Sequence, residues 1–220
     1  MSFERTTPCG VISGTACQWP GITAYKGIRY ATAGRWESPI PVTHWDGVYD
    51  ATQYGACCYQ PRAFYDEAAA PGKAFYYNEF RKGETYTYSE DCLFLNVYTP
   101  ALRDGGKRPV LCYIHGGGYN NGSGSHPLYD GVDLCHRGDV VVVTVHHQLN
   151  AFGYLYRGES GDERLRDAGN VGQLDLTDPL RWVREYAHEL GGDEDNVTVF
   201  GPSGGGTKIA PPMALSLFHI

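Results

Sequence analysis

The sequence predicts an α/β fold built around parallel strands. Three runs in the second half of the chain are continuously apolar rather than alternating: PVLCYIHGGG, DVVVVTVHH and NVTVFG. Such runs are typical of strands that are covered on both faces. Between the last two lies DPLRWVREYAHEL, whose apolar residues recur at the three- and four-residue spacing of a helix. Strand, helix and strand in this order indicate an α/β architecture, which we assign to a single domain, residues 1–220.

The first half of the chain predicts smaller elements. Residues 8–31 alternate turn residues with short apolar stretches, which predicts a small N-terminal antiparallel sheet. Residues 34–90 are rich in Tyr, Gly and Pro and predict mostly loop, with a short helix within EAAAPGKAFYYNEF (67–80). The stretch CLFLNVYTP predicts a further strand, which Pro100 ends.

The helix before the last strand has recognisable ends. Asp178 fits its N-cap, Pro179 its first helical position and Gly191 the residue just past its end. A second helix is expected after Ser203. Because Pro211–Pro212 remove backbone donors and disfavour helix at the preceding residue, we expect that helix to be short.

Composition restricts the class of partner. The net charge of −7 argues against nucleic acid or an anionic membrane as a partner. No apolar run approaches the ~20 residues that span a bilayer. The N-terminus, MSFERTTPCG, contains no apolar core of a signal peptide, so none is predicted, and the compartment stays open between cytoplasmic and secreted.

The seven cysteines do not predict a metal site. Seven is an odd number, so at least one is unpaired within the chain. There is no C-x-x-C pair and no His/Cys spacing that fits zinc, and we expect neither a metal nor an organic cofactor. Cys112 lies in an apolar run and is predicted to be a buried thiol.

A serine follows the last predicted strand, in VTVFGPSGGGTK (197–208). Gly201, Gly204 and Gly205 flank Ser203, and small residues at such positions are what a sharp strand-to-helix turn requires. This turn would present the Ser203 hydroxyl at a helix N-terminus, where backbone N–H groups face a developing anion. Gly-x-Ser-x-Gly alone is a weak signal in a chain with 29 glycines.

A second glycine turn strengthens the prediction. HGGGY (115–119) also follows a buried strand, and consecutive glycines let backbone N–H donors approach an oxyanion. Taken alone, HGGGY equally fits an ordinary turn after a strand. Both turns end strands of the same predicted sheet, where ligands of α/β proteins bind. Together they predict acyl-transfer chemistry at Ser203.

Three segments of the chain resemble the motifs of a known family. SEDCLFLNVYTP (89–100), PVLCYIHGGGYNNGSG (109–124) and the stretch from NVGQLDL to GPSGGG (170–206) are similar to ordered motifs of the type-B carboxylesterases. This family has the α/β-hydrolase fold, and the resemblance is to its N-terminal portion. It implies a mixed, mostly parallel sheet flanked by helices, truncated relative to the full fold.

The resemblance implies roles for individual residues. Ser203 would be the nucleophile of a carboxylic ester hydrolase, and the N–H groups of Gly117, Gly118 and Gly204 its oxyanion hole. No cofactor is implied, and the substrate would be a small carboxylic ester, whether aliphatic, aryl or phenolic. The family also implies a disulfide from Cys92 to an upstream cysteine. Its partner is expected to be Cys58, in CYQ, with the neighbouring Cys57 as the alternative.

The sequence departs from the family at several points. The family usually has Glu before the serine and Ala after it, where this chain has Pro202 and Gly204. After Ser203 there is one histidine, His219, and no Asp or Glu, so a Ser–acid–His triad is not completed in family order. Four other histidines are candidate bases, and the sequence favours none of them: His115, His146, His147 and His188.

Two alternatives to a complete esterase therefore stay open. One is a non-catalytic binding protein of the same lineage, and the other is one part of a split enzyme. A truncated sheet would expose an apolar edge, which favours self-association. Three aromatic residues are candidates for lining an acyl or alcohol pocket: Tyr119, Tyr129 and Trp36.

Overall fold

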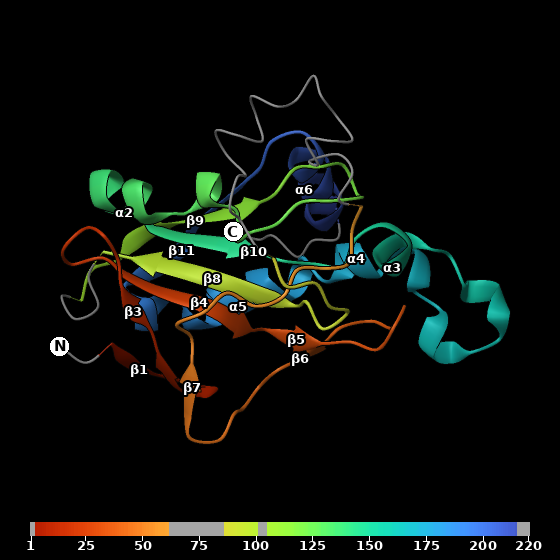
Figure 1. Ribbon diagram of the computed structural model, residues 1–220, viewed down its shortest axis with the longest axis horizontal. Helices are drawn as coiled ribbons and strands as arrows, with labels where there is room; N and C mark the ends of the chain where they lie inside the picture. The colour runs from red at the N-terminus through yellow and green to blue at the C-terminus, as the bar shows by residue number, and fades with distance from the viewer. Residues whose placement is uncertain (1–2, 62–85, 101–104, 215–220) are drawn as a thin grey trace.

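The computed structural model describes residues 3–61, 86–100 and 105–214, which form a layered α/β structure (Figure 1). The helix predicted within residues 67–80 lies outside the described residues, as does His219. No helix in the described part of the chain is long and apolar enough to cross a membrane.

A mixed six-stranded sheet forms the centre of the molecule, in the order β11-β9-β10-β8-β4-β3. The three runs predicted to be parallel strands are β9, β10 and β11, and they do pair in parallel. The other half of the sheet is antiparallel, because β8 runs opposite to both β10 and β4. The six strands are β3 (Thr15–Ala16), β4 (Thr23–Arg29), β8 (Phe94–Thr99), β9 (Arg108–Ile114), β10 (Val141–Val145) and β11 (Gly192–Phe200).

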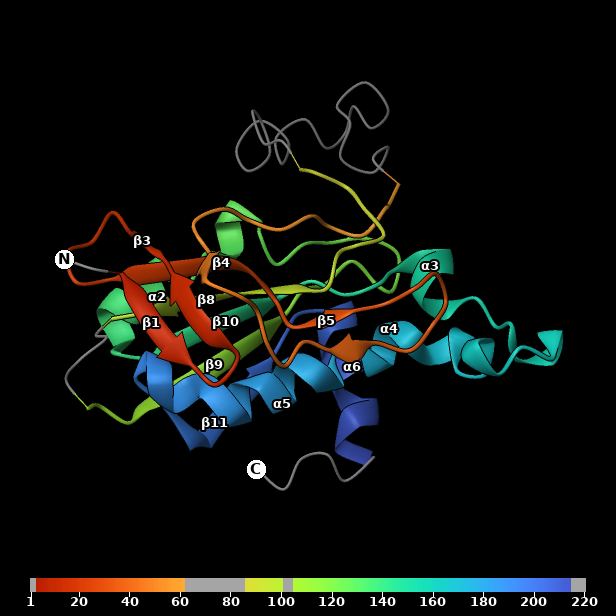
Figure 2. The same cartoon turned by 90° about the horizontal axis from the view of Figure 1, so that it is seen from below.

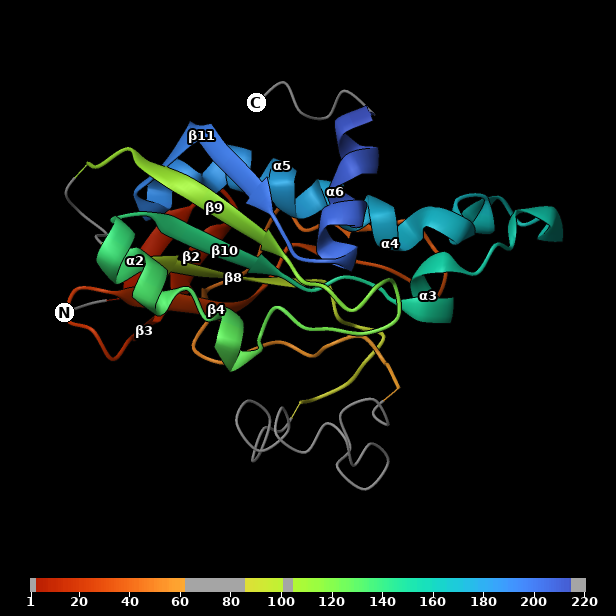
Figure 3. The same ribbon diagram turned by 90° about the horizontal axis from the view of Figure 1, so that it is seen from above.

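Both faces of this sheet are covered, which explains the continuous apolar runs. Along β10, Val141 and Val143 belong to the larger core cluster together with Trp182 of α5 (Thr177–Tyr186). The residue between them, Val142, packs on the opposite face with Cys135 of α2 (Val132–Gly138). Successive side chains of a strand point to opposite faces, so a strand between two cores has no polar face. Figure 3 shows α2 and α5 on opposite sides of the strands.

A small sheet at the N-terminus packs beside the main one (Figure 2). A small N-terminal sheet was predicted from residues 8–31, and of these β2 (Gly10–Ser13) pairs antiparallel with β1 (Glu4–Thr7), which precedes the predicted range. The strands β3 and β4 of that range pair antiparallel within the main sheet instead. A third strand, β7 (Val48–Asp50), pairs with β2 in parallel. A separate two-stranded antiparallel pair joins β5 (Ala31–Thr32) to β6 (Ile40–Pro41).

The predicted start of the helix before β11 was wrong, whereas its predicted end is confirmed. Helix α5 begins at Thr177, so Asp178 lies inside the first turn, and its carboxylate pairs with Arg181 at 2.7 Å instead of capping. A 3₁₀ turn, η6 (Ala187–Leu190), continues the helix, and Gly191 follows it with φ 81°, the left-handed conformation that glycine adopts readily.

The helix after Ser203 is longer than predicted: α6 runs from Gly204 to Ala214, through both prolines. A proline at 212 cannot donate to the carbonyl of Lys208, four residues earlier. The side-chain amide of Gln173, in α4 (Val171–Leu174), donates to that carbonyl instead, at 2.6 Å. A tertiary hydrogen bond thus satisfies an acceptor that the helix itself leaves free.

The remaining described helices are short: η2 (Pro127–Tyr129), α3 (Asn150–Tyr154), η3 (Gly158–Ser160), η4 (Glu163–Leu165) and η5 (Ala168–Asn170). The segment from α3 to η5 extends from the body of the molecule, as the right-hand side of Figure 1 shows.

Candidate active site

Ser203 lies in a strained turn between β11 and α6. Its φ is 51°, in the left-handed region that residues other than glycine seldom occupy. The N–H of Gly205 donates to the carbonyl of Pro202 at 2.8 Å, and the N–H of Thr207 donates to the carbonyl of Ser203 at 3.3 Å. The chain therefore turns sharply from strand to helix at Ser203, which is exposed to solvent.

Glycines two residues before and after the serine let the turn pack against β9. A Cβ atom added at Gly201 or at Gly205 would come closer than 3.0 Å to the carbonyl oxygen of Ile114. Backbone cannot yield as a flexible side chain can, so both positions require glycine. This is the crowding that the Gly-x-Ser-x-Gly pattern predicted.

The second glycine turn follows the end of β9 at Ile114. Gly117 and Gly118 have φ values of 90° and 63°. The carbonyl of Gly117 accepts the N–H groups of Asn120 and Asn121, each at 3.3 Å, which closes the turn. We call residues 116–119 the oxyanion loop from here on, after the role predicted for it.

The structure brings the two turns into contact. A Cβ atom built on Gly204 would lie 2.5 Å from both the Cα and the carbonyl oxygen of Gly118, so the two backbones touch. A Cβ atom on Gly116 would lie 3.7 Å from the Cβ of Ser203. The four residues predicted from sequence, Ser203, Gly117, Gly118 and Gly204, are therefore neighbours at one end of the parallel strands. Figure 3 shows α6 starting where β11 and β9 end.

A model of the Carboxylesterase family matches residues 2–217 of the chain. The chain belongs to the carboxylesterase family. It is 41% identical over 214 residues to a para-nitrobenzyl esterase from Bacillus subtilis, a match that covers 96% of this chain and 40% of the relative. It is 36% identical to a mouse acylcarnitine hydrolase, with 98% of this chain and 38% of the relative covered.

A solved carboxylesterase has the same fold. The crystal structure of the carboxylesterase EST55 from Geobacillus stearothermophilus superimposes with a TM-score of 0.82 at 39% identity, covering 98% of this chain and 42% of that one. The chain thus spans about two-fifths of the length of the carboxylesterases it matches.

No histidine in the described part of this carboxylesterase chain hydrogen bonds to Ser203. The imidazoles of His115, His146 and His147 are buried at the sheet edge and bonded to other groups. His188 pairs with Glu189 on the surface at 3.2 Å. The described residues therefore bring the predicted serine and the predicted amide donors together, without a histidine that hydrogen bonds to the serine.

A buried lysine lies beneath the oxyanion loop. Lys208, one turn into α6, has no exposed surface. Its Nζ donates to the carbonyl of His115 at 3.3 Å and lies 3.1 Å from Nε2 of His147. Burial lowers the pKa of Lys208 to about 7. Burial and the neighbouring Lys208 lower the pKa of His115 to about 3 and that of His147 well below its usual value.

The cysteines predicted to pair lie side by side. Cys58 and Cys92 are buried free thiols in the structure, and a hydrogen bond from the Cys58 side chain, followed by burial, raises the pKa of Cys92 well above its usual value. Cys57, the alternative partner, is 3.2 Å from the hydroxyl of Ser123. A disulfide between Cys58 and Cys92 stays a prediction. Cys112 is a buried thiol, as predicted, and burial raises its pKa to about 12.

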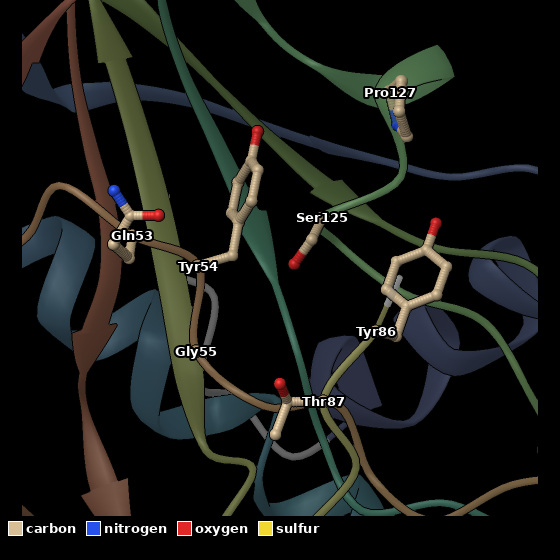
Figure 4. A pocket seen from close by; sticks show the side chains of 7 residues that line it. All are labelled: Gln53, Tyr54, Gly55, Tyr86, Thr87, Ser125 and Pro127. Atoms are coloured by element: carbon tan, nitrogen blue, oxygen red, sulfur yellow. The ribbon is translucent and has the colours of Figure 1, made fainter. Parts of the chain in front are cut away.

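A hydrogen-bonded Ser–His pair that does not include Ser203 lies next to a small pocket. The hydroxyl of Ser125 is 2.6 Å from Nε2 of His146, whose Nδ1 lies 3.0 Å from the carbonyl of Ala56. Ser125 lines a cavity of about 300 Å³, and Figure 4 shows its hydroxyl among those of the surrounding side chains. None of the residues lining this cavity belongs to either glycine turn. They are Gln53, Tyr54, Gly55, Tyr86, Thr87, Ser125 and Pro127.

The aromatic candidates for a substrate pocket are differently placed. Tyr119, in the oxyanion loop, is partly exposed and packs edge-on against Tyr154. Tyr129 packs against Tyr113, and the indole N–H of Trp36 donates to the carbonyl of Ala151 at 2.8 Å. Of the three, only Tyr119 belongs to the loop beside Ser203.

Proposed function

We propose that the chain carries the ester-hydrolysing centre of a carboxylesterase, with Ser203 as its nucleophile. The Ser203 hydroxyl oxygen attacks the carbonyl carbon of a small carboxylic ester and loses its proton. The carbonyl oxygen becomes an oxyanion, which accepts hydrogen bonds from the N–H groups of Gly117, Gly118 and Gly204. The alcohol then leaves with a proton, and water cleaves the acyl-Ser203 ester to release the acid.

The observation that supports this proposal best is the contact between the two glycine turns. Gly204 lies against Gly118, directly after an exposed serine whose φ is 51°. Amide donors held in place before the reaction need no reorganisation as charge develops, so they stabilise the transition state more than the substrate. The positive end of the α6 dipole at Gly204 adds to this stabilisation.

The proton acceptor for Ser203 is not assigned to a described residue. A histidine base with an orienting acid is the usual solution in serine hydrolases. None of the described histidines hydrogen bonds to Ser203, so we assign the base to a residue outside the described ranges or to a second polypeptide. With an oxyanion hole and binding alone, catalysis of roughly 10³-fold over water is expected.

The experiment is acylation of the chain by p-nitrophenyl acetate, followed by intact-mass measurement and peptide mapping. We expect one acetyl group per chain, located on Ser203, and no acetylation at this site in Ser203→Ala. Ser125→Ala is the matched control, because the Ser125 hydroxyl lies 2.6 Å from Nε2 of His146 and Ser125 is therefore the rival candidate for acylation. Acetylation of Ser125 instead, or turnover unaffected by Ser203→Ala, would overturn the proposal.

The second candidate is a non-catalytic binding protein of the same lineage. The observation that favours it is that no histidine among residues 3–61, 86–100 and 105–214 hydrogen bonds to Ser203. Absence of any acylation at Ser203, with the chain folded, is the result that would support this candidate.

A further inference from the structure

We propose that Lys208 is a positioning residue that ties helix α6 to both ends of the oxyanion loop and so fixes the distance between Gly204 and Gly118. The inference rests on the proposed function, because it explains how the amide donors of that site are held in place. Lys208 does not contact Ser203 in the described hydrogen bonds, and no direct part in the chemistry is assigned to it.

The geometry of Lys208 connects three segments that are distant in sequence. It lies one helical turn after Gly204, and its Nζ reaches the carbonyl of His115, the residue before the three glycines. The same Nζ is 5.8 Å from the centre of the Tyr119 ring, just after the three glycines. The third contact, with Nε2 of His147, fixes the amine to the segment that follows β10.

The burial of Lys208 costs free energy, which its hydrogen bonds have to offset. The side chain has no exposed surface, and no carboxylate in the described part of the chain pairs with it. A buried amine without a counter-charge is unfavourable, and an apolar side chain of similar length would fill the space at lower cost. The donors of Lys208, rather than its volume, therefore explain why a lysine occupies this position.

The donors and acceptors around Lys208 match. A neutral amine has two N–H donors, and two acceptors face them, the His115 carbonyl and the His147 ring. His147 lies with Nδ1 2.8 Å from the carbonyl of Gln148, so Nδ1 carries the proton and Nε2 is free to accept. The lowering of the pKa of Lys208 to about 7 by burial is consistent with this neutral arrangement.

Fixing the two turns matters because catalysis depends on small distances. A displacement of about 1 Å in a positioned group reduces rates by as much as 10²-fold. In Lys208→Met the side chain keeps its length but loses both donors, so Gly118 is free to move away from Gly204. We expect the variant to react with a fluorophosphonate at Ser203 about tenfold more slowly or worse.

The experiment combines that labelling rate with NMR of the histidine ring on the 220-residue chain. In the wild-type chain we expect His147 to be the Nδ1–H tautomer. In Lys208→Met the Gln148 carbonyl still holds the proton on Nδ1, so we expect the same tautomer but a shifted Nε2 nitrogen signal, because Nε2 loses its donor. We also expect shifted amide signals for Gly117, Gly118 and Gly204, which a merely space-filling lysine would not produce. Lys208→Gln, which keeps a side-chain donor, is the second variant, and we expect it to recover part of the labelling rate.

Lys26→Met is the matched control, because Lys26 is a partly buried lysine on β4 whose Nζ lies 4.6 Å from the centre of the Tyr54 ring. It should change neither measurement. Unchanged amide signals of Gly117, Gly118 and Gly204 in Lys208→Met overturn the inference, as does an unchanged labelling rate. If wild-type Ser203 is not labelled at all, the proposed function fails, and the ring and amide signals still decide whether Lys208 ties the two turns together.

Discussion

At the scale of single residues, the backbone of Ser203 carries strain that follows from its position. A non-glycine residue in the left-handed region costs roughly 1–2 kcal/mol, and Ser203 has φ 51°. Such strain is common at active sites, where it is part of how a side chain is presented. The strain predicts an unusual response to substitution.

Ser203→Gly should raise the free energy of unfolding by up to about 1 kcal/mol. Glycine relieves a strain of roughly 1–2 kcal/mol, but its greater conformational entropy in the unfolded chain opposes this by roughly 0.5–1 kcal/mol. Ser203→Ala keeps the strain and should stay within about 0.5 kcal/mol of wild type, because the residue is exposed. Urea unfolding of the three proteins measures the difference. A Ser203→Gly variant less stable than Ser203→Ala would contradict the strain.

Another residue-scale consequence concerns the buried carboxyl of Asp175. Burial raises its pKa to about 8, although the backbone and side-chain N–H groups of Gln148, which donate to it, favour the charged form. The folded protein therefore holds a proton between about pH 4 and pH 8 that the unfolded chain has released, so stability falls as pH rises through that window.

In Asp175→Asn this fall should disappear. The expected loss in the wild type is at most about 6 kcal/mol, because the pKa rises from 3.8 to about 8 and each pH unit in that window is worth about 1.4 kcal/mol. Chemical unfolding at several pH values measures it, with the exposed Asp195 changed to Asn as the control. A wild-type stability that rises between pH 4 and pH 8, with Asp175→Asn parallel to it, would show that the carboxyl is ionised in the folded protein.

The residues of the candidate site were predicted from sequence to different degrees. Ser203 and the glycines were predictable because a sharp turn and a close backbone approach each demand one residue type at one position. Lys208 was not identified, although it stands in the GGGTK stretch. Its burial depends on the ends of β9 and β10, and nothing local in the sequence distinguishes it from a solvated lysine.

At the scale of elements, helix α6 shows how tertiary contacts override local preference. Pro211–Pro212 predicted an early end, yet the helix continues to Ala214. The compensating donor is Gln173, 35 residues earlier in the chain. The antiparallel direction of β8 could not be predicted from the sequence either. All six residues of β8 are buried, and a buried strand has the same apolar pattern in either direction. Continuous apolarity reports coverage on both faces, not strand direction.

The packing of α6 on β9 gives a prediction at this scale. In Gly205→Ala the new Cβ atom would meet the carbonyl of Ile114, forcing the helix away from the sheet. We expect a loss of about 1–3 kcal/mol in stability together with slower acylation of Ser203. In Gly138→Ala, the control, the nearest atoms would be 3.6 Å away, in Val140. If Gly205→Ala has the same stability and the same rate of Ser203 acylation as Gly138→Ala, the close contact between α6 and β9 is absent.

At the scale of the whole molecule, one edge of the main sheet is formed by a long strand, β11. Among the described residues, β11 has a neighbour only on its β9 side. The chain covers about two-fifths of the length of the carboxylesterases it matches. An unpaired edge strand is a template for association with another chain.

We predict that the chain self-associates through β11. Thr198 is exposed on this strand between Val197 and Val199, which pack against the core. Thr198→Lys adds a charge to the edge and should shift the distribution towards monomer in light scattering after size-exclusion chromatography. Tyr156→Lys, at another exposed apolar position, is the control. A monomeric wild type at high concentration would contradict the prediction.

The measurement that tests the account most directly is a crystal structure of the chain after reaction with a fluorophosphonate. We predict an adduct on Ser203 whose phosphonyl oxygen lies about 2.7–3.1 Å from the amide nitrogens of Gly117, Gly118 and Gly204. An adduct on Ser203 with that oxygen directed into solvent, or an adduct on Ser125, would contradict the convergence of the two glycine turns on one reactive hydroxyl.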